Sequence, residues 1–175
     1  MKKLAYLFSI LGVALLMCAC SDNQSARERI SELDEPDSLA TNLIRIPYQP
    51  SGLHEIVTVA FNGVPMNLMW DTGCSITTIP LTEFERMIKE DKITGDDLKG
   101  VLKSRIADGT IVESFSFNIG TVTFNTISGA PKELHDVIIQ VSPNPNASSL
   151  LGKNIIDELG HCRRNESESC FVLEK

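Results

Sequence analysis

The sequence predicts a mostly β fold, namely a small closed or partly closed barrel with two or three short helices. Short runs of β-branched, aromatic and aliphatic residues recur along the chain, and Gly, Pro, Asn and Asp residues separate them. Apolar residues at helical spacing are confined to brief segments. No internal repeat interrupts this pattern, so one β-rich domain accounts for it.

The first strands are expected around a tight turn. Asn62-Gly63 is a residue pair typical of a two-residue hairpin, so the runs on either side of it should pair. A further β-branched run ends at Pro80. Strands are therefore predicted at residues 43–48, 56–61, 64–70 and 76–79.

The apolar period changes after Pro80. Thr82 and Glu85 have the spacing of a capping box, in which a hydroxyl and a carboxylate satisfy free amides of a first helical turn. Residues 94–98 are expected to begin a second short helix. The apolar residues that follow helical spacing, and so predict the first helix, are Leu81, Phe84, Met87 and Ile88.

The second half of the chain returns to strands. Turns are expected at Asp108-Gly109 and at Gly120, and a loop rich in Pro, Asn and Ser at residues 142–149. Residues 153–159 should form a short helix that Gly160 ends. The predicted strands begin at Val101 and continue at residues 111–119, 122–127, 135–141, 150–152 and 170–173.

Residues 1–19 have the features of a secretory signal peptide. Lys2 and Lys3 give a basic start, an apolar run at residues 4–16 follows, and small residues come next. A membrane-spanning anchor is the less expected alternative, because a permanent span needs about 20 apolar residues. Residues 20–42 are polar and predict a flexible tether, which leaves residues 43–175 as one domain.

The segment at residues 16–21 resembles a bacterial lipoprotein signal, in which a cysteine becomes the lipidated first residue. Cys20 is the better candidate, because the small Ala19 precedes it, whereas the bulky Met17 precedes Cys18. Acyl chains would then hold the protein at the cell envelope, on a periplasmic or outer-membrane face. Ordinary cleavage near Ala19, with a free secreted product, is the alternative.

The charge of the chain argues against a nucleic-acid partner. The 16 basic and 23 acidic residues give a net charge of −7; without Lys2 and Lys3 of the signal, 14 basic residues remain and the net charge is near −9. His54, His135 and His161 show no metal-ligand spacing, so neither a metal nor another cofactor is expected.

Cys162 and Cys170 flank a polar stretch at residues 163–169. They could close a hairpin disulfide in an oxidising compartment, or remain as two unpaired thiols.

Asp71-Thr72-Gly73 is the clearest candidate for chemistry. It follows the apolar run 64–70, which places a carboxylate at the end of a buried strand, and Gly73 allows the backbone to bend sharply after it. The tripeptide alone is a weak signal, because an Asx-type turn after a strand has the same composition.

With two further segments, this motif resembles the retropepsin-like aspartic proteases, in particular single-domain bacterial members, over residues 56–160. Residues 68–75 (LMWDTGCS) are similar to the family's apolar run into Asp-Thr-Gly. Residues 105–110 (RIADGT) resemble the flap turn that closes over the substrate. Residues 150–160 (LLGKNIIDELG) are similar to the second signature, in which two aliphatic residues and a glycine lead into a short helix.

The resemblance implies an acid-protease barrel that forms one half of an aspartic endopeptidase. Peptide hydrolysis by this route needs two carboxylates that share a proton, one to take a proton from water and one to protonate the carbonyl oxygen. Because the chain has one Asp-Thr-Gly, a homodimer is expected in which each subunit contributes Asp71 as the catalytic residue.

The resemblance also assigns roles around Asp71. Thr72 would lock the two active-site loops together, and Gly152 after Leu151 would allow close packing beneath the carboxylate pair. The flap would grip an extended segment of a peptide or protein substrate as an added strand. The remaining residues so assigned are Gly73, Cys74 and Ser75 in the active-site loop and Ala107, Asp108 and Gly109 in the flap.

Two departures from the family pattern leave an alternative open. Cys74 stands where Ala or Ser is usual, although a small thiol at such a place more often packs than reacts. The flap lacks the run of glycines of viral members. A catalytically silent envelope lipoprotein of the same fold, which binds peptides or a protein partner, is therefore the second hypothesis.

Overall fold

The computed structural model describes residues 43–105 and 109–174. The predicted signal peptide and tether, with Cys20, and the flap residues Ala107 and Asp108 lie outside the described residues. Within the described ranges, no helix is long and apolar enough to cross a membrane.

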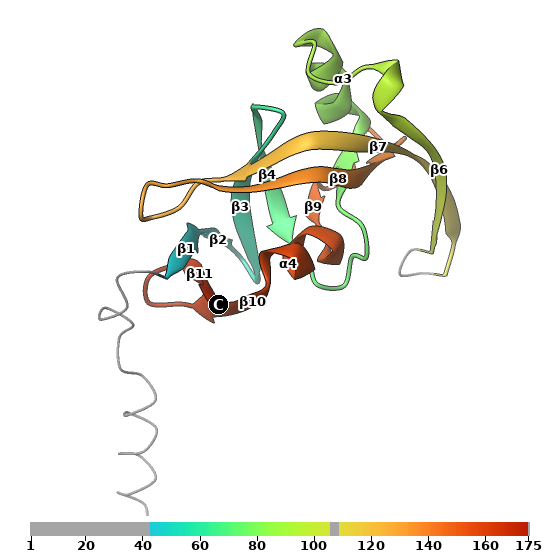
Figure 1. Cartoon of the computed structure of the whole chain (residues 1–175). Coiled ribbons are helices and arrows are strands. Elements are labelled where there is room, and N and C mark those ends of the chain that lie inside the picture. The colour runs from blue at the N-terminus through green and yellow to red at the C-terminus, as the bar shows by residue number, and fades with distance from the viewer. Residues whose placement is uncertain (1–42, 106–108, 175) are drawn as a thin grey trace, which may run out of the picture. The chain divides into compact units, whose positions relative to one another are not determined.

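Most of the described chain is strand, and two α-helices and one 3₁₀ helix connect the strands (Figure 1). The strands are β1 (Ile44–Pro47), β2 (Gln49–Ser51), β3 (His54–Phe61), β4 (Val64–Trp70), β5 (Thr78–Pro80), β6 (Leu98–Arg105), β7 (Ile111–Phe124), β8 (Lys132–Ser142), β9 (Leu150–Leu151), β10 (His161–Asn165) and β11 (Cys170–Glu174). The helices are α3 (Leu81–Lys89), η2 (Gly95–Asp97) and α4 (Lys153–Leu159).

The larger sheet closes on itself. Its strand order is β2-β3-β4-β9-β5-β8-β7-β6, and an additional pairing joins β3 to β7 through Val59–Phe124, Ala60–Thr123 and Phe61–Val122. The ring therefore runs β3-β4-β9-β5-β8-β7 and back to β3, while β6 extends it as an arm along β7. The predicted mostly β barrel is confirmed.

Apolar side chains at alternate positions along the strands fill the interior of the barrel. Val64, Met66 and Leu68 of β4 are buried, whereas the intervening Pro65 and Asn67 are exposed. Because successive side chains of a strand point to opposite faces, this pattern puts one face of the Asn62-Gly63 hairpin into the core. The strand that leads to Asp71 is thus anchored along its length by apolar burial.

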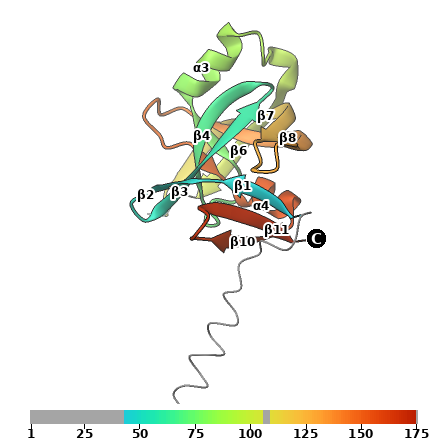
Figure 2. The same ribbon diagram turned by 90° about the vertical axis from the view of Figure 1, so that its left-hand side faces the viewer.

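A second sheet of order β1-β11-β10 packs beside the barrel (Figure 2). Strand β11 lies in its centre and is almost wholly buried, and an aromatic stack joins it to β4: the rings of Phe171 and Trp70 have centroids 3.9 Å apart at an interplanar angle of 20°. Of the polar stretch at residues 163–169, the first three residues belong to strand β10, and residues 166–169 form the turn to β11.

Of the two alternatives for Cys162 and Cys170, the register of β10 and β11 favours unpaired thiols over a disulfide. Cys162 lies opposite Leu173, and Cys170 lies opposite Asn165, so the two cysteines are offset by three positions, about 10 Å along the strands. A disulfide requires Cα atoms within about 7 Å. Both thiols are free in the structure.

Two local predictions were wrong. The helix α3 begins after Pro80 without a side-chain cap, and Thr82 donates instead to the Pro145 carbonyl at 3.2 Å. A capping box does form, but at Thr94 and Asp97 before η2. Gly120 makes no turn, because β7 continues through it.

Candidate active site

Asp71 begins the loop that joins β4 to β5, and β9 lies between these two strands (Figure 1). Strand β9 runs parallel to β4, with Trp70 opposite Leu151, and antiparallel to β5. The backbone N–H of Asp71 donates to the Leu151 carbonyl at 3.0 Å. The two predicted signatures, far apart in sequence, are therefore hydrogen-bonded neighbours at the point where Asp71 leaves its strand.

The carboxylate of Asp71 is oriented by its own loop. Its Oδ1 accepts a hydrogen bond from the Gly73 N–H at 2.8 Å, and its carbonyl accepts one from the Cys74 N–H at 3.2 Å. The Asx-type turn that the tripeptide also predicted is thus present as part of the site. Asp71 is half-buried, whereas Thr72, Gly73 and Ser75 are exposed.

Gly152 brings the backbone after β9 directly against this loop. A Cβ atom at Gly152 would lie 2.6 Å from both the Ile76 carbonyl carbon and the Thr77 nitrogen, so only glycine fits. The first amides of α4 then donate to the loop: Lys153 N–H to the Cys74 carbonyl at 2.7 Å and Asn154 N–H to the Ser75 carbonyl at 3.1 Å. Gly152 therefore packs directly against the loop that follows Asp71.

Two residues of the site, Thr77 and Asn154, were missed in the sequence. Thr77 is fully buried; its N–H and hydroxyl both donate to Asn154 Oδ1, at 2.8 and 3.0 Å, and its Oγ1 accepts from the Gly152 N–H at 2.9 Å. Asn154 Nδ2 donates to the Ile138 carbonyl of β8 at 2.8 Å. The only sequence signal is a polar residue within a β-branched run, and nothing local indicates its partner.

Cys74 packs beside the carboxylate as a protonated thiol. Its Sγ donates to the Ile76 carbonyl at 3.0 Å and lies 3.9 Å from Thr78 Oγ1. Burial raises the pKa of the Cys74 thiol, the negative charge of Asp71 raises it further, and the contacts with Thr78 and Ile76 oppose the shift. A nucleophilic cysteine needs the opposite shift, so the geometry favours a packing role.

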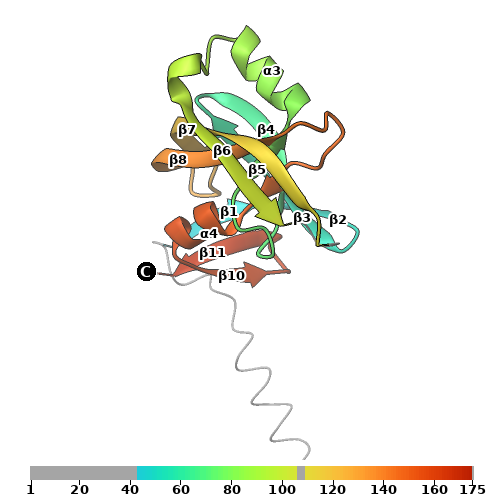
Figure 3. The same cartoon turned by 90° about the vertical axis from the view of Figure 1, so that its right-hand side faces the viewer.

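The hairpin of β6 and β7 occupies the place predicted for the flap. Its arms pair from Leu98–Phe117 to Arg105–Ile111, and Gly109 near its tip has a φ of +87°, which favours glycine. Figures 1 and 3 show the end of this hairpin on the same side of the barrel as the loop after β4. Near this end of β6, Ser104 Oγ donates to Gln140 Oε1 of β8 at 3.0 Å.

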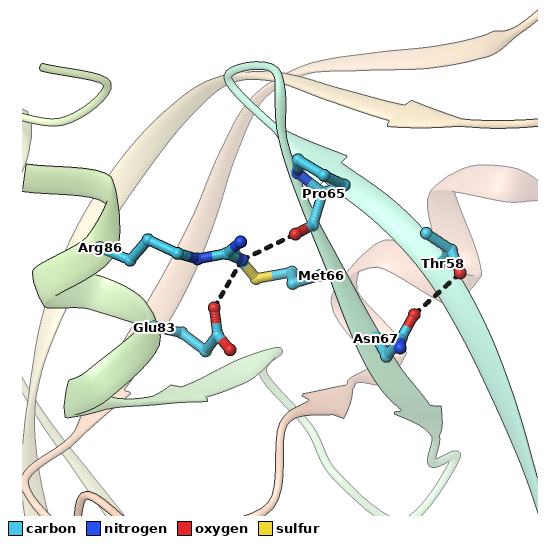
Figure 4. A pocket seen from close by; sticks show the side chains of 6 residues that line it. All are labelled: Thr58, Pro65, Met66, Asn67, Glu83 and Arg86. Atoms are coloured by element: carbon cyan, nitrogen blue, oxygen red, sulfur yellow. Dashed lines mark hydrogen bonds and ion pairs between the residues drawn. The ribbon is translucent and has the colours of Figure 1, made fainter. Parts of the chain in front are cut away.

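A hollow of about 370 Å³ lies elsewhere, between α3 and the β3–β4 hairpin (Figure 4). Arg86 crosses it, with Nη2 donating to the Pro65 carbonyl at 2.7 Å and to Glu83 Oε2 at 2.6 Å. Asp71 does not line it, so this hollow marks where α3 is fastened to β4. The lining residues are Thr58, Pro65, Met66, Asn67, Glu83 and Arg86.

Among residues 43–105 and 109–174, no group of three or more His, Cys, Asp and Glu side chains could hold a metal ion. The arrangement around Asp71 instead offers a fixed carboxylate at a half-open surface, next to backbone groups held by hydrogen bonds.

Comparisons with known proteins show which family and which solved structures this chain resembles. A family model described as aspartyl protease matches residues 57–155, more than half of the chain. A retropepsin-like aspartic protease from Rickettsia conorii is similar in structure, with a TM-score of 0.50 and 17% sequence identity over 75% of this chain and 88% of that chain. The EIAV protease complexed with the inhibitor HBY-793 has a TM-score of 0.46 and 22% identity over 64% of this chain and 95% of that chain. No curated protein sequence matches.

Proposed function

This chain belongs to the aspartyl protease family, and we propose that it is an aspartic endopeptidase that hydrolyses peptide bonds in extended polypeptide segments. The observation that carries the proposal is the placement of Asp71. Its backbone is fixed to Leu151 at 3.0 Å, and its carboxylate is oriented by the Gly73 N–H at 2.8 Å. A carboxylate held in this way can act as a general base toward water.

The proposed enzyme is a homodimer, because the reaction needs a second carboxylate. Two carboxylates close together share one proton, and the pair supplies both the base and the acid. A two-fold axis beside the loop would bring together two copies of Asp71. Thr72 and Ser75 are exposed next to Asp71, so the loop has a surface that a second copy can approach.

The β6–β7 hairpin is the proposed substrate clamp. An extended peptide between this hairpin and the Asp71 loop would be held by backbone hydrogen bonds, as an added strand is. Such binding depends on the substrate's backbone more than on its side chains, which fits an endopeptidase of extended segments.

A digest of a mixed peptide library tests the activity. A form that begins at Ser21 should cleave the library, and Asp71→Asn should abolish cleavage while circular dichroism and thermal unfolding remain those of the unmodified protein, because the amide keeps the size of the side chain but cannot take up the proton. Equal cleavage by the Asn variant would exclude Asp71 as the catalytic group. Stoichiometric peptide binding without turnover would instead indicate a peptide-binding protein of the same fold.

We propose also that the protein is lipid-anchored at the bacterial cell envelope through Cys20. The proposal rests on the order of residues 1–21 alone. Cells that express Cys20→Ala and are fed an alkyne-labelled fatty acid should yield unlabelled protein, whereas the matched Cys18→Ala variant should remain labelled and in the membrane fraction. Label on the Cys20→Ala protein would contradict the assignment.

A further inference from the structure

Trp70 and Phe171 form a ring stack directly beneath the residue that carries the chemistry. The two centroids are 3.9 Å apart, and Trp70 is the last residue of β4, immediately before Asp71. Phe171 belongs to β11 in the separate sheet and is 4% exposed. No part of the barrel's own strand pairing requires this contact.

The geometry points to Phe171 as a positioning residue for Asp71, an inference that rests on the proposed function. Asp71 follows Trp70 directly in the chain, so a rotation of the end of β4 that displaced the Trp70 ring would also move the Asp71 side chain. Strand β9 holds only the backbone at this point, through Trp70 opposite Leu151. The side chain of Trp70 is held by the ring stack on Phe171 together with its packing against the core.

Phe171 also contacts a second aromatic ring. The ring of Phe171 lies against that of Tyr48, with centroids 5.0 Å apart, and Arg164 Nε donates to the Tyr48 hydroxyl at 3.5 Å. Arg164 also pairs with Glu55 of β3 at 2.9 Å. A continuous chain of contacts thus runs from the barrel strand β3 through the small sheet to the base of the Asp71 loop. The β1-β11-β10 sheet therefore acts as a support for the catalytic strand.

The chain offers an internal control and an internal reporter. A second ring pair, Phe84 with Phe117, has centroids 4.4 Å apart and joins α3 to β7, and neither residue belongs to β4, β9 or the Asp71 loop. Losing a ring there should weaken the fold without moving the carboxylate. Trp70 is the only tryptophan in the sequence, so the tryptophan emission reports on the surroundings of this ring.

The test compares Phe171→Leu, Phe171→Tyr and Phe84→Leu in the full-length chain, with peptide cleavage measured at concentrations where sedimentation gives equal dimer fractions. Phe171→Leu should lower kcat about tenfold or more and leave KM within about twofold, since a small misplacement of a reacting group lowers the rate without weakening the grip on the substrate. Its tryptophan emission should shift to the red. Phe171→Tyr, which keeps the ring, should restore both, and Phe84→Leu should change neither.

Three results would overturn the inference: a Phe171→Leu kcat within about twofold of the unmodified chain, an equal kcat loss in Phe84→Leu, or unshifted tryptophan emission in Phe171→Leu. If Phe171→Leu does not fold, Phe171→Met, of similar volume and without a ring, replaces it in the same comparison. Absence of cleavage by the unmodified chain would contradict the proposed function itself. An active unmodified chain beside a fully active Phe171→Leu would contradict only the positioning role.

Discussion

At the scale of single residues, the candidate site depends on atoms that have no room to move. Gly152→Ala places a methyl group 2.6 Å from two backbone atoms of the Asp71 loop, neither of which can rotate away. We expect this change to destabilise the fold by on the order of 3 kcal/mol and to abolish peptide cleavage. Urea unfolding measures the first effect and a peptide digest the second.

Gly95→Ala is the matched control, because a Cβ atom at Gly95 meets nothing within 4 Å and Gly95 has no positive φ. It should leave stability within about 0.5 kcal/mol of the unmodified protein. A Gly152→Ala protein as stable as the Gly95→Ala protein would show that the loop can yield.

Asn154 makes the second prediction at this scale. Asn154→Ala removes the acceptor for the N–H and the hydroxyl of the fully buried Thr77, and the donor to the Ile138 carbonyl. A buried polar group left without a partner costs about 1–3 kcal/mol, so we expect a loss of about 3 kcal/mol in the free energy of unfolding. Asn118→Ala, which removes one exposed bond of 3.2 Å to Asp136, should cost less than about 0.5 kcal/mol. Similar losses in the two variants would contradict a special role for Asn154.

At the scale of elements, the two threonines with the sequence features of caps behave differently. Thr94 Oγ1 accepts from the Asp96 N–H at 3.3 Å, and the Thr94 N–H donates to Asp97 Oδ2 at 2.8 Å. Thr94→Ala should therefore lower stability by about 1 kcal/mol, the usual value of an N-cap. Thr82→Ala, in a helix that Pro80 precedes without a side-chain cap, should cost clearly less. Thermal unfolding of both variants measures the two losses of stability. A larger loss in Thr82→Ala than in Thr94→Ala would mean that Thr82 caps its helix.

The sequence predicted those elements in which the pattern of buried and exposed residues can be recognised within a single strand or helix. Alternation in β3 and β4, with Asn62-Gly63 between them, determines the hairpin locally. Strand β10 escaped prediction because its residues are mostly charged or exposed. It is held instead by its partner: His161 and Arg163 both lie near Glu174 of β11, at 3.5 and 3.4 Å.

Gly120 shows why a turn signal can mislead. Asn62 N–H donates to the Thr121 carbonyl at 2.8 Å, and the Thr121 N–H donates back to Asn62 Oδ1 at 3.0 Å. A Cβ atom at Gly120 would lie 3.5 Å from that same oxygen. That distance is an ordinary van der Waals contact, so the two hydrogen bonds, and not a need for glycine, join β7 to the first hairpin. They link distant residues, which no local pattern contains.

The residues of the candidate site also fall into two groups, those that a local pattern predicts and those that it does not. Asp71 and Gly152 could be predicted because each lies in a recognisable run of neighbours, and the parallel pairing of β4 with β9 brings the two runs together. Thr77 and Asn154 could not, because their function arises only when the loop, α4 and β8 meet. A polar side chain in a strand and another in a helix carry no sign of each other in the sequence.

At the scale of the whole molecule, the proposed dimer predicts how activity depends on composition. If each site needs two copies of Asp71, a mixture of unmodified chain and Asp71→Asn chain contains three kinds of dimer, of which only the unmodified homodimer has both carboxylates. After subunit exchange, activity at constant total protein should follow the square of the unmodified fraction. An equal mixture should therefore retain about one quarter of full activity rather than half.

The shape of this curve separates the dimer from a self-sufficient subunit. The comparison is a dilution series of unmodified chain in buffer, kept at protein concentrations well above the one at which half of the chains are dimeric. In that series activity should fall in proportion to the unmodified fraction. The Asp71→Asn chain pairs normally but supplies no carboxylate, so it draws unmodified subunits into inactive dimers. Activity should therefore fall more steeply in this mixture than in the dilution series. If the Asp71→Asn mixture followed the dilution line after complete exchange, one subunit would suffice for cleavage. The second carboxylate would then have to come from within the chain, although within its described part Asp71 alone stands at the junction of β4 and β9.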